Sequence, residues 1–136
     1  MATTPTYPSG IGGIAKTILP ADTTALVDVY DNSASSTPVR VEALNITSND
    51  TATVNVAFRF HNGSAAFLLG VARAVTLAGT DGAAIRVNAL AVVGTLSPDG
   101  IPVIEVPPGY KLQANSIAAV TAAKTVTIAG WVRKFV

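Results

Sequence analysis

The chain has 136 residues, of which 49% are apolar or aromatic and 12% are charged, with a formal net charge of +1 at pH 7 and no cysteine. This length fits one domain, and the absence of cysteine excludes disulfides, a thiolate nucleophile and a thiolate metal site. The nine basic residues are spread along the chain, so the sequence predicts no concentrated positive field that would attract nucleic acid.

The N-terminal segment, residues 1–14, is predicted to be a flexible arm ahead of a single β-sandwich domain that spans residues 15–136. Two prolines disfavour helix and interior strand, and three glycines are costly to order. Tyr7, Ile11 and Ile14 give this arm apolar side chains that could dock on a neighbour or could belong to a frayed terminus. The segment lacks the basic start and apolar run of a signal peptide, so secretion by that route is not expected.

The next residues predict short strands and then a hairpin. Residues 16–20 and 25–30 have strand-like composition, and a polar loop follows them. Residues 54–60 alternate apolar with polar side chains, the period of a strand with one buried face. Residues 39–47 are also rich in strand formers, and Ser48-Asn49-Asp50 favours a turn, so these two segments are predicted to form a β-hairpin.

The rest of the chain continues this pattern of short strands and turns. Asn62-Gly63 suits a tight hairpin turn, after which residues 65–77 are predicted to return as a strand, although a helical period also fits them. Residues 84–96 have the length of one long strand or of two strands broken at a glycine. Residues 97–100 and 107–109 are turns with proline and glycine, and the remaining predicted strands are residues 101–106, 110–113 and 125–136.

The whole pattern predicts an all-β fold. About eight short strands, separated by turn signals and without a long helical segment, indicate an antiparallel β-sandwich, and the jelly-roll type is favoured. The mean hydropathy of +0.47 is high for a small monomer. Alanine in a lightly built core is one explanation, and an apolar patch covered by other subunits is the favoured one. No apolar run is long enough for a membrane helix, so no membrane partner is expected.

The final predicted strand carries bulky groups on both faces. Trp131 is predicted to belong to the core, and Phe135, next to Arg133 and Lys134, is predicted to form a subunit contact. Gly130 marks a candidate bulge in this strand. The candidate interface residues are Tyr7, Ile11, Ile14, Arg133, Lys134 and Phe135.

Side chains that could carry chemistry are few and scattered. His61 is the single histidine, and with no cysteine it cannot form a usual zinc site, so a solvated histidine at a strand end is the simpler interpretation. The eight acidic residues mostly adjoin turn residues, and no pair is nominated for acid–base catalysis. The sequence therefore predicts no catalytic, cofactor-binding or metal-binding residue, and a protein that is not an enzyme.

Two segments carry a resemblance to a known class of proteins. Asn45 to Phe60 is an apolar strand ending in Asn and Thr, a polar turn and an alternating strand, and Ile104 to Ala114 is an apolar strand, a Pro-Gly turn and a Leu-Gln-Ala segment. Over roughly Val39 to Trp131, this arrangement resembles the small β-sandwich virion proteins of tailed bacteriophages, including capsid decoration (cement) proteins.

The resemblance implies a structural role rather than a reaction. We would expect a homo-oligomer made in the host cytoplasm that binds the major capsid protein on the surface of the virion and bridges coat subunits. A tail, neck or fibre component that binds a receptor or a carbohydrate is the alternative. In that case Tyr30, Tyr110 or Trp131 would stack on sugar.

Overall fold

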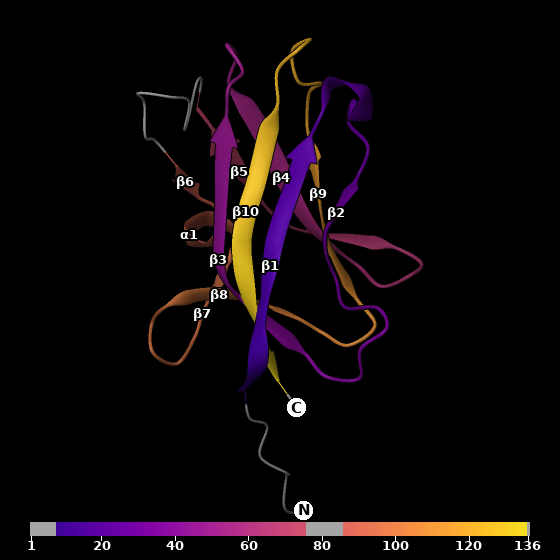
Figure 1. Ribbon diagram of the computed structural model, residues 1–136, viewed down its shortest axis with the longest axis vertical. Helices are drawn as coiled ribbons and strands as arrows, with labels where there is room; N and C mark the ends of the chain where they lie inside the picture. Colours follow the sequence, from indigo (N-terminus) through magenta and orange to yellow (C-terminus); the bar gives the residue numbers. More distant parts are fainter. Residues whose placement is uncertain (1–7, 76–85, 136) are drawn as a thin grey trace, which may run out of the picture.

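The structure is a computed structural model that describes residues 8–75 and 86–135. Its strands form two antiparallel sheets that pack face to face (Figure 1), which confirms the predicted all-β sandwich. The strands are β1 (Pro8–Ile18), β2 (Val27–Asp31), β3 (Val39–Ser48), β4 (Val54–His61), β5 (Ala66–Ala74), β6 (Val87–Asn88), β7 (Thr95–Leu96), β8 (Pro102–Val106), β9 (Lys111–Ser116) and β10 (Val126–Phe135), with a 3-10 turn at Pro20–Asp22 and one helical turn, α1, at Leu90–Val93.

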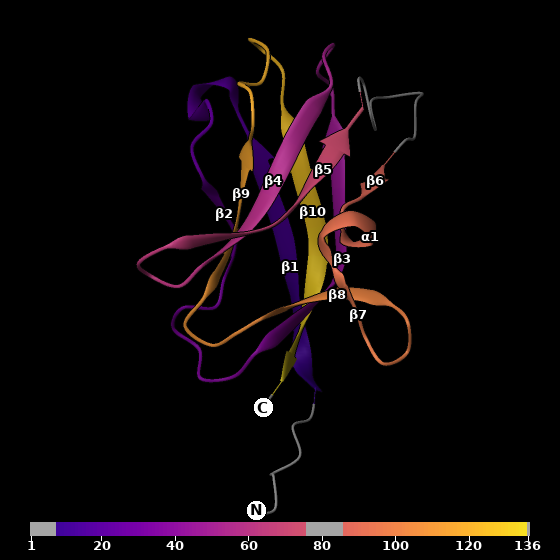
Figure 2. The same ribbon diagram turned by 180° about the vertical axis from the view of Figure 1, so that it is seen from behind.

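The chain passes repeatedly from one sheet to the other. The first sheet has the order β1-β10-β3-β8-β7, with β6 also paired to β3, and the second has the order β2-β9-β4-β5 (Figures 1 and 2). Strands β1 to β4 alternate between the sheets, and so do β8, β9 and β10. The jelly-roll type stays a prediction, and this strand order is compatible with it.

The core lies between the two sheets and is built from the inward side of each strand. In β3 the buried residues Val41, Leu44 and Ile46 alternate with partly exposed ones, and in β4 Val56 and Phe58 are fully buried. Burying a side chain of this size contributes roughly 1.5–3 kcal/mol. The alternation read from the sequence at residues 54–60 therefore identifies side chains of β4 that face the core.

The predicted hairpin between β3 and β4 is wrong. β3 pairs with β10, β8 and β6, whereas β4 pairs with β5 and β9, so residues 49–53 cross from one sheet to the other. Asp50, which is 1% exposed, fixes this crossing because its carboxylate accepts hydrogen bonds from Ala52 N (2.9 Å) and from Thr121 N and Oγ1 (2.8 and 2.7 Å). The polar turn residues thus join two loops at one end of the sandwich.

The predicted flexible arm is wrong for its second half. β1 begins at Pro8 and pairs antiparallel with β10 as far as Ile18 opposite Val126, so residues 8–14 belong to the sandwich. Main-chain hydrogen bonds hold a strand without help from side chains, and a proline is tolerated at the first position of a strand. Gly12 also uses its lack of a side chain, because a Cβ there would lie 3.1 Å from Val132 Cγ2.

The region predicted as one long strand or two strands at residues 84–96 contains the two short strands β6 and β7 with a helical turn between them, and residues 84–85 lie outside the described part. Leu90 and Val93 of α1 are buried and pack toward β5. Gly70 of β5 makes room for this turn, since a Cβ on Gly70 would lie 3.0 Å from Val93 Cγ1. The main-chain N–H of Leu90 donates to Asn88 Oδ1 at 3.1 Å, which satisfies one of the free donors at the start of the turn.

Two predicted turns are confirmed. Gly63 has φ +96° between β4 and β5, which pair as a hairpin. Gly109 has φ +81°, and Tyr110 N donates to Pro107 O at 3.2 Å across its turn. Both positions have the positive φ that favours glycine.

Candidate functional site

The outer face of the first sheet carries a row of four residues on four neighbouring strands. Ile11 of β1 lies opposite Arg133 of β10, Arg133 lies opposite Arg40 of β3, and Arg40 lies opposite Glu105 of β8. Two arginines that face each other across a ladder repel one another. The row is therefore stable only if each arginine has its own anionic partner.

Each arginine has such a partner on a neighbouring strand. Arg40 donates from Nη2 and Nε to Glu105 Oε1 at 2.7 and 3.2 Å. Arg133 donates from Nε to Glu42 Oε1 at 2.7 Å and from Nη2 to Oε2 at 3.0 Å, a bidentate pair. The hydrogen bonds to Glu42, together with its charge, raise the pKa of Arg133 above its ordinary value. The charge of each guanidinium group is thus balanced by a carboxylate, and each group is already oriented before any partner binds.

Both guanidinium groups also lie over aromatic rings. The central carbon of Arg40 is 5.7 Å from the ring centre of Phe135, and that of Arg133 is 6.0 Å from the ring centre of Trp131. These distances fall in the range of cation–π attraction. We call Arg40, Glu42, Glu105, Trp131, Arg133 and Phe135 the arginine face.

A bulge in β3 creates the bidentate pair. Ala43 lies opposite Trp131 and Val41 lies opposite Val132, so Glu42 is an extra residue that turns its carboxylate outward. The predicted bulge thus occurs beside Gly130, but the extra residue is on the partner strand. Gly130 permits the close approach, because a Cβ there would stand 1.8 Å from the Ala43 carbonyl oxygen.

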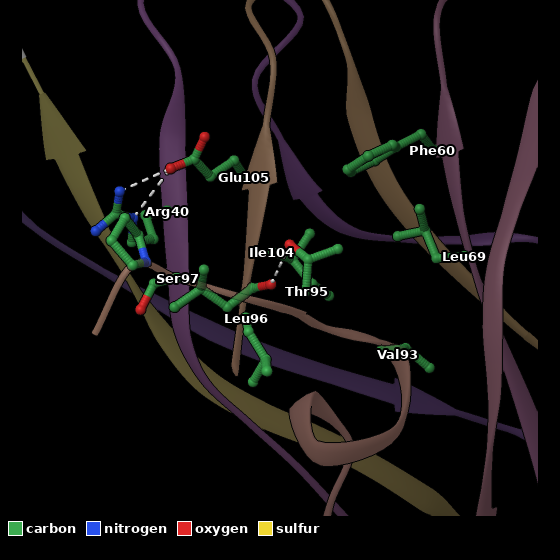
Figure 3. Close-up of a pocket in the computed structure, with 11 residues that line it drawn as sticks. Arg40, Phe60, Leu69, Val93, Thr95, Leu96, Ser97, Ile104 and Glu105 are labelled. Atoms are coloured by element: carbon green, nitrogen blue, oxygen red, sulfur yellow. Dashed lines mark hydrogen bonds and ion pairs between the residues drawn. The ribbon is translucent and has the colours of Figure 1, made fainter. Parts of the chain in front are cut away.

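Two of the clefts that border the arginine face meet at Arg40. The tryptophan cleft, with a volume of about 390 Å³, lies between Trp131 and the connection from β7 to β8, and its lining includes Asp99 and Ser97. The edge cleft, about 300 Å³, lies where the two sheets separate. In Figure 3 the Arg40–Glu105 pair stands on one side of the edge cleft, and Phe60, Leu69 and Val93 stand on the other. Arg40 lines both clefts.

The structure places the predicted interface residues in different environments. Ile11 is 67% exposed on the outer face, and Arg133 and Phe135 belong to the arginine face. Ile14 is only 4% exposed, so its assignment to an interface is wrong: it points inward from β1 into the core. Lys134 is exposed and lines another cleft beside Tyr30, and Tyr7 lies outside the described residues.

The prediction that Trp131 belongs to the core is also wrong. Trp131 is partly exposed on the outward side of β10, the same side as Arg133, while Val132 between them is fully buried. Sequence reasoning missed Arg40, Glu42 and Glu105 because their pairings join distant strands. One signal was present in the sequence: the apolar residues change phase between Val41 and Leu44, which indicates a bulge.

The second sheet carries a polar cluster on the neighbouring strands β2 and β9. Lys111 Nζ lies 3.1 Å from Asp28 Oδ2 and 3.6 Å from Asp31 Oδ2, and Gln113 Nε2 donates to Asp28 Oδ1 at 2.7 Å. The hydrogen bond from Gln113 is the largest of the effects that lower the pKa of Asp28. Tyr30 borders this cluster, and burial, followed by the charge of Asp31, raises the pKa of its phenol.

Within residues 8–75 and 86–135, no group of three or more metal-ligating side chains lies together, and no helix is long and apolar enough to cross a membrane. His61 lies at the end of β4, where its Nδ1 accepts a hydrogen bond from Gly63 N at 3.0 Å. No family model matches the chain, and no curated protein and no solved structure is significantly similar to it. The geometry of the arginine face therefore carries the functional argument.

Proposed function

We propose that this chain is a structural virion protein of the capsid-decoration type, which binds a phage head and bridges coat subunits through its arginine face. The proposal also includes the formation of homo-oligomers and the absence of a catalytic role. The observation that carries it is the row of neutralised arginines flanked by Trp131 and Phe135 on one open face of a small sandwich.

This arrangement has the composition of a protein contact. Tryptophan, phenylalanine and arginine are enriched in the centres of protein interfaces, and arginine and tryptophan in their energetic hot spots. Because Glu42 and Glu105 already hold the two guanidinium groups, less side-chain freedom would be lost on docking. A partner could lie on this face without burying an unpaired charge.

Exposed apolar side chains add to the proposed contact area. Ile11 on β1 is 67% exposed, Leu96 on β7 is 74% exposed, and Ile101, which lines the tryptophan cleft, is 57% exposed. Removing such surface from water contributes about 25 cal/mol per Å². A contact of modest strength, repeated by the symmetry of a shell, would then add up to firm attachment.

The direct test is binding to empty shells assembled from the coat protein of the same virus. Trp131→Ala should weaken binding by about 30-fold, the loss typical of a hot-spot aromatic residue. Ile117→Ala is the matched control, because Ile117 is 52% exposed but lies in the connection after β9, away from the arginine face. Equal binding by both variants, each folded by circular dichroism, would refute the proposed contact.

A second candidate is carbohydrate binding on a tail or fibre. The tryptophan cleft favours it, because this cleft joins the ring of Trp131 to the polar side chains of Asp99 and Ser97. Aromatic rings and carboxylates of this kind can hold the apolar face and the hydroxyl groups of a sugar. A glycan array separates the two candidates: a hit that Trp131→Ala abolishes, with no binding to shells, would favour the sugar.

A further inference from the structure

The hairpin between β4 and β5 reaches away from the body of the sandwich (Figures 1 and 2). Its tip is Asn62-Gly63, and both residues are exposed. Gly63 has φ +96° and no side chain that would shield its main-chain nitrogen. This pair is the one Asn-Gly dipeptide in the sequence.

The main-chain nitrogen of Gly63 has a base beside it. Gly63 N donates to His61 Nδ1 at 3.0 Å. A main-chain amide is a poor nucleophile while it keeps its proton. An imidazole nitrogen within hydrogen-bond distance can accept that proton as the nitrogen attacks, which is the geometry required of a general base.

The side-chain carbonyl group of Asn62 is positioned to act as the electrophile. Its Oδ1 accepts hydrogen bonds from Ser64 N and Ala65 N, both at 2.9 Å. Two donors on one carbonyl oxygen polarise the carbonyl group and stabilise the negative charge that develops there during attack. The nucleophile and the electrophile belong to adjacent residues, so no encounter step is needed.

We propose that Asn62 is a site of self-catalysed deamidation, with His61 as the general base. The proton of Gly63 N passes to His61 Nδ1, and the nitrogen forms a bond to Asn62 Cγ. The attack leaves an electron pair on Oδ1, and this pair then re-forms the carbonyl double bond while the bond from Cγ to Nδ2 breaks. Nδ2 takes the proton from His61 and leaves as ammonia. Solvent water then opens the resulting succinimide to aspartate or isoaspartate. No oxidant or reductant is needed.

The product changes the tip of the hairpin. A carboxylate replaces the amide, which lowers the formal net charge from +1 by one unit. Isoaspartate also inserts a methylene group into the main chain at the turn that joins β4 to β5. The fraction of molecules with this altered hairpin tip would therefore increase with the age of the protein.

The experiment incubates the purified full chain and follows the peptide that contains Asn62 by mass spectrometry, with separation of aspartate from isoaspartate. Wild type should gain the mass that replaces NH₂ by OH and should yield both products. His61→Gln should react more slowly, by about tenfold or more, since positioned bases contribute 10²-fold and upward in active sites. Asn32-Ser33 is the internal reference, because the amide of Asn32 is buried and hydrogen-bonded.

The same comparison in concentrated urea separates geometry from sequence. Unfolding removes the contact between His61 and Gly63, so the two proteins should then react at similar rates. Equal rates of wild type and His61→Gln in the folded state, a His61 effect that persists unchanged in urea, or the absence of isoaspartate would each overturn the proposal.

Discussion

Gly130 of β10 lies against the main-chain carbonyl of Ala43 on β3, so closely that a Cβ on Gly130 would stand 1.8 Å from the oxygen. The contact is with main chain, so no side chain can rotate away. Gly130→Ala should therefore lower the free energy of unfolding by about 3 kcal/mol or more, measured by urea denaturation.

Gly13→Ala is the matched control for that substitution. Gly13 lies opposite Trp131 on the neighbouring strand β1, and a Cβ there would have no atom within 4 Å. Alanine orders more readily than glycine in a strand, so this variant should be neutral or more stable by about 0.5 kcal/mol. A similar loss in both variants would mean that the close contact at Ala43 is not the cause.

Asp50 should make the fold sensitive to acid. Burial is the largest single influence on its pKa and raises it, but the hydrogen bonds from Thr121 and Ala52 together lower the pKa below the ordinary value of 3.8. A carboxyl group with a lowered pKa stabilises the fold above its unfolded pKa, and this contribution is lost as the pH falls through the folded pKa.

Asp50→Asn tests this pH dependence. The free energy of unfolding of the variant should be lower by about 1–3 kcal/mol at pH 7, because the amide nitrogen that replaces one carboxylate oxygen cannot accept a hydrogen bond. Its stability should then fall less steeply than that of wild type below pH 4. Asp28 and Asp31 also have lowered pKa values, so part of the acid dependence should remain. Parallel stability curves from pH 7 to pH 2 would contradict the role given to Asp50.

Asn32 should tolerate no negative charge. Its Nδ2 lies within hydrogen-bond distance of the carbonyl oxygens of Thr37, Val106 and Pro107, at 3.0, 3.1 and 3.1 Å. Asn32→Asp would place a carboxylate against three hydrogen-bond acceptors and should lower the free energy of unfolding by about 3 kcal/mol or more. Asn88→Asp is the control, because Asn88 is exposed and uses its oxygen as an acceptor for Leu90 N. In thermal unfolding, the melting temperature of Asn32→Asp should lie well below that of Asn88→Asp.

Arg133→Lys should separate folding from binding. Lysine cannot reproduce the bidentate pair with Glu42. Surface ion pairs contribute about 0.2–1 kcal/mol, so the melting temperature should change little. Binding to shells should nevertheless weaken by about tenfold, because the pre-oriented guanidinium group is gone. Lys134→Arg, one residue further along β10, should leave binding unchanged.

The local parts of the fold could be predicted from the sequence. Period-2 alternation predicted the strands at Val54–His61 and Val126–Phe135, and the content of strand-forming residues predicted the strand at Val39–Ser48. The positions of glycine predicted the turns at Gly63 and Gly109. Alternation reports which side chains face a core, but it does not say which sheet a strand joins. The same Ser-Asn-Asp turn residues serve equally well in a hairpin and in a crossing between sheets, where Asp50 binds a distant loop.

The candidate site was only partly predictable for the same reason. Arg133 and Phe135 could be nominated because both faces of the last strand carry bulky groups. Arg40, Glu42 and Glu105 join them through pairings between distant strands, which a single sequence does not reveal. The prediction of a flexible arm failed for residues 8–14. Proline and glycine content indicates how costly a segment is to order by itself, but it takes no account of the main-chain pairing that β10 supplies.

The measurement that tests the central proposal most directly is cosedimentation of the purified chain with empty shells of the same virus, alongside light scattering of the chain alone. We expect an oligomer that sediments with the shells, and a strong loss of cosedimentation for Trp131→Ala but not for Ile117→Ala. A strictly monomeric protein that stays in the supernatant at every concentration would contradict the account.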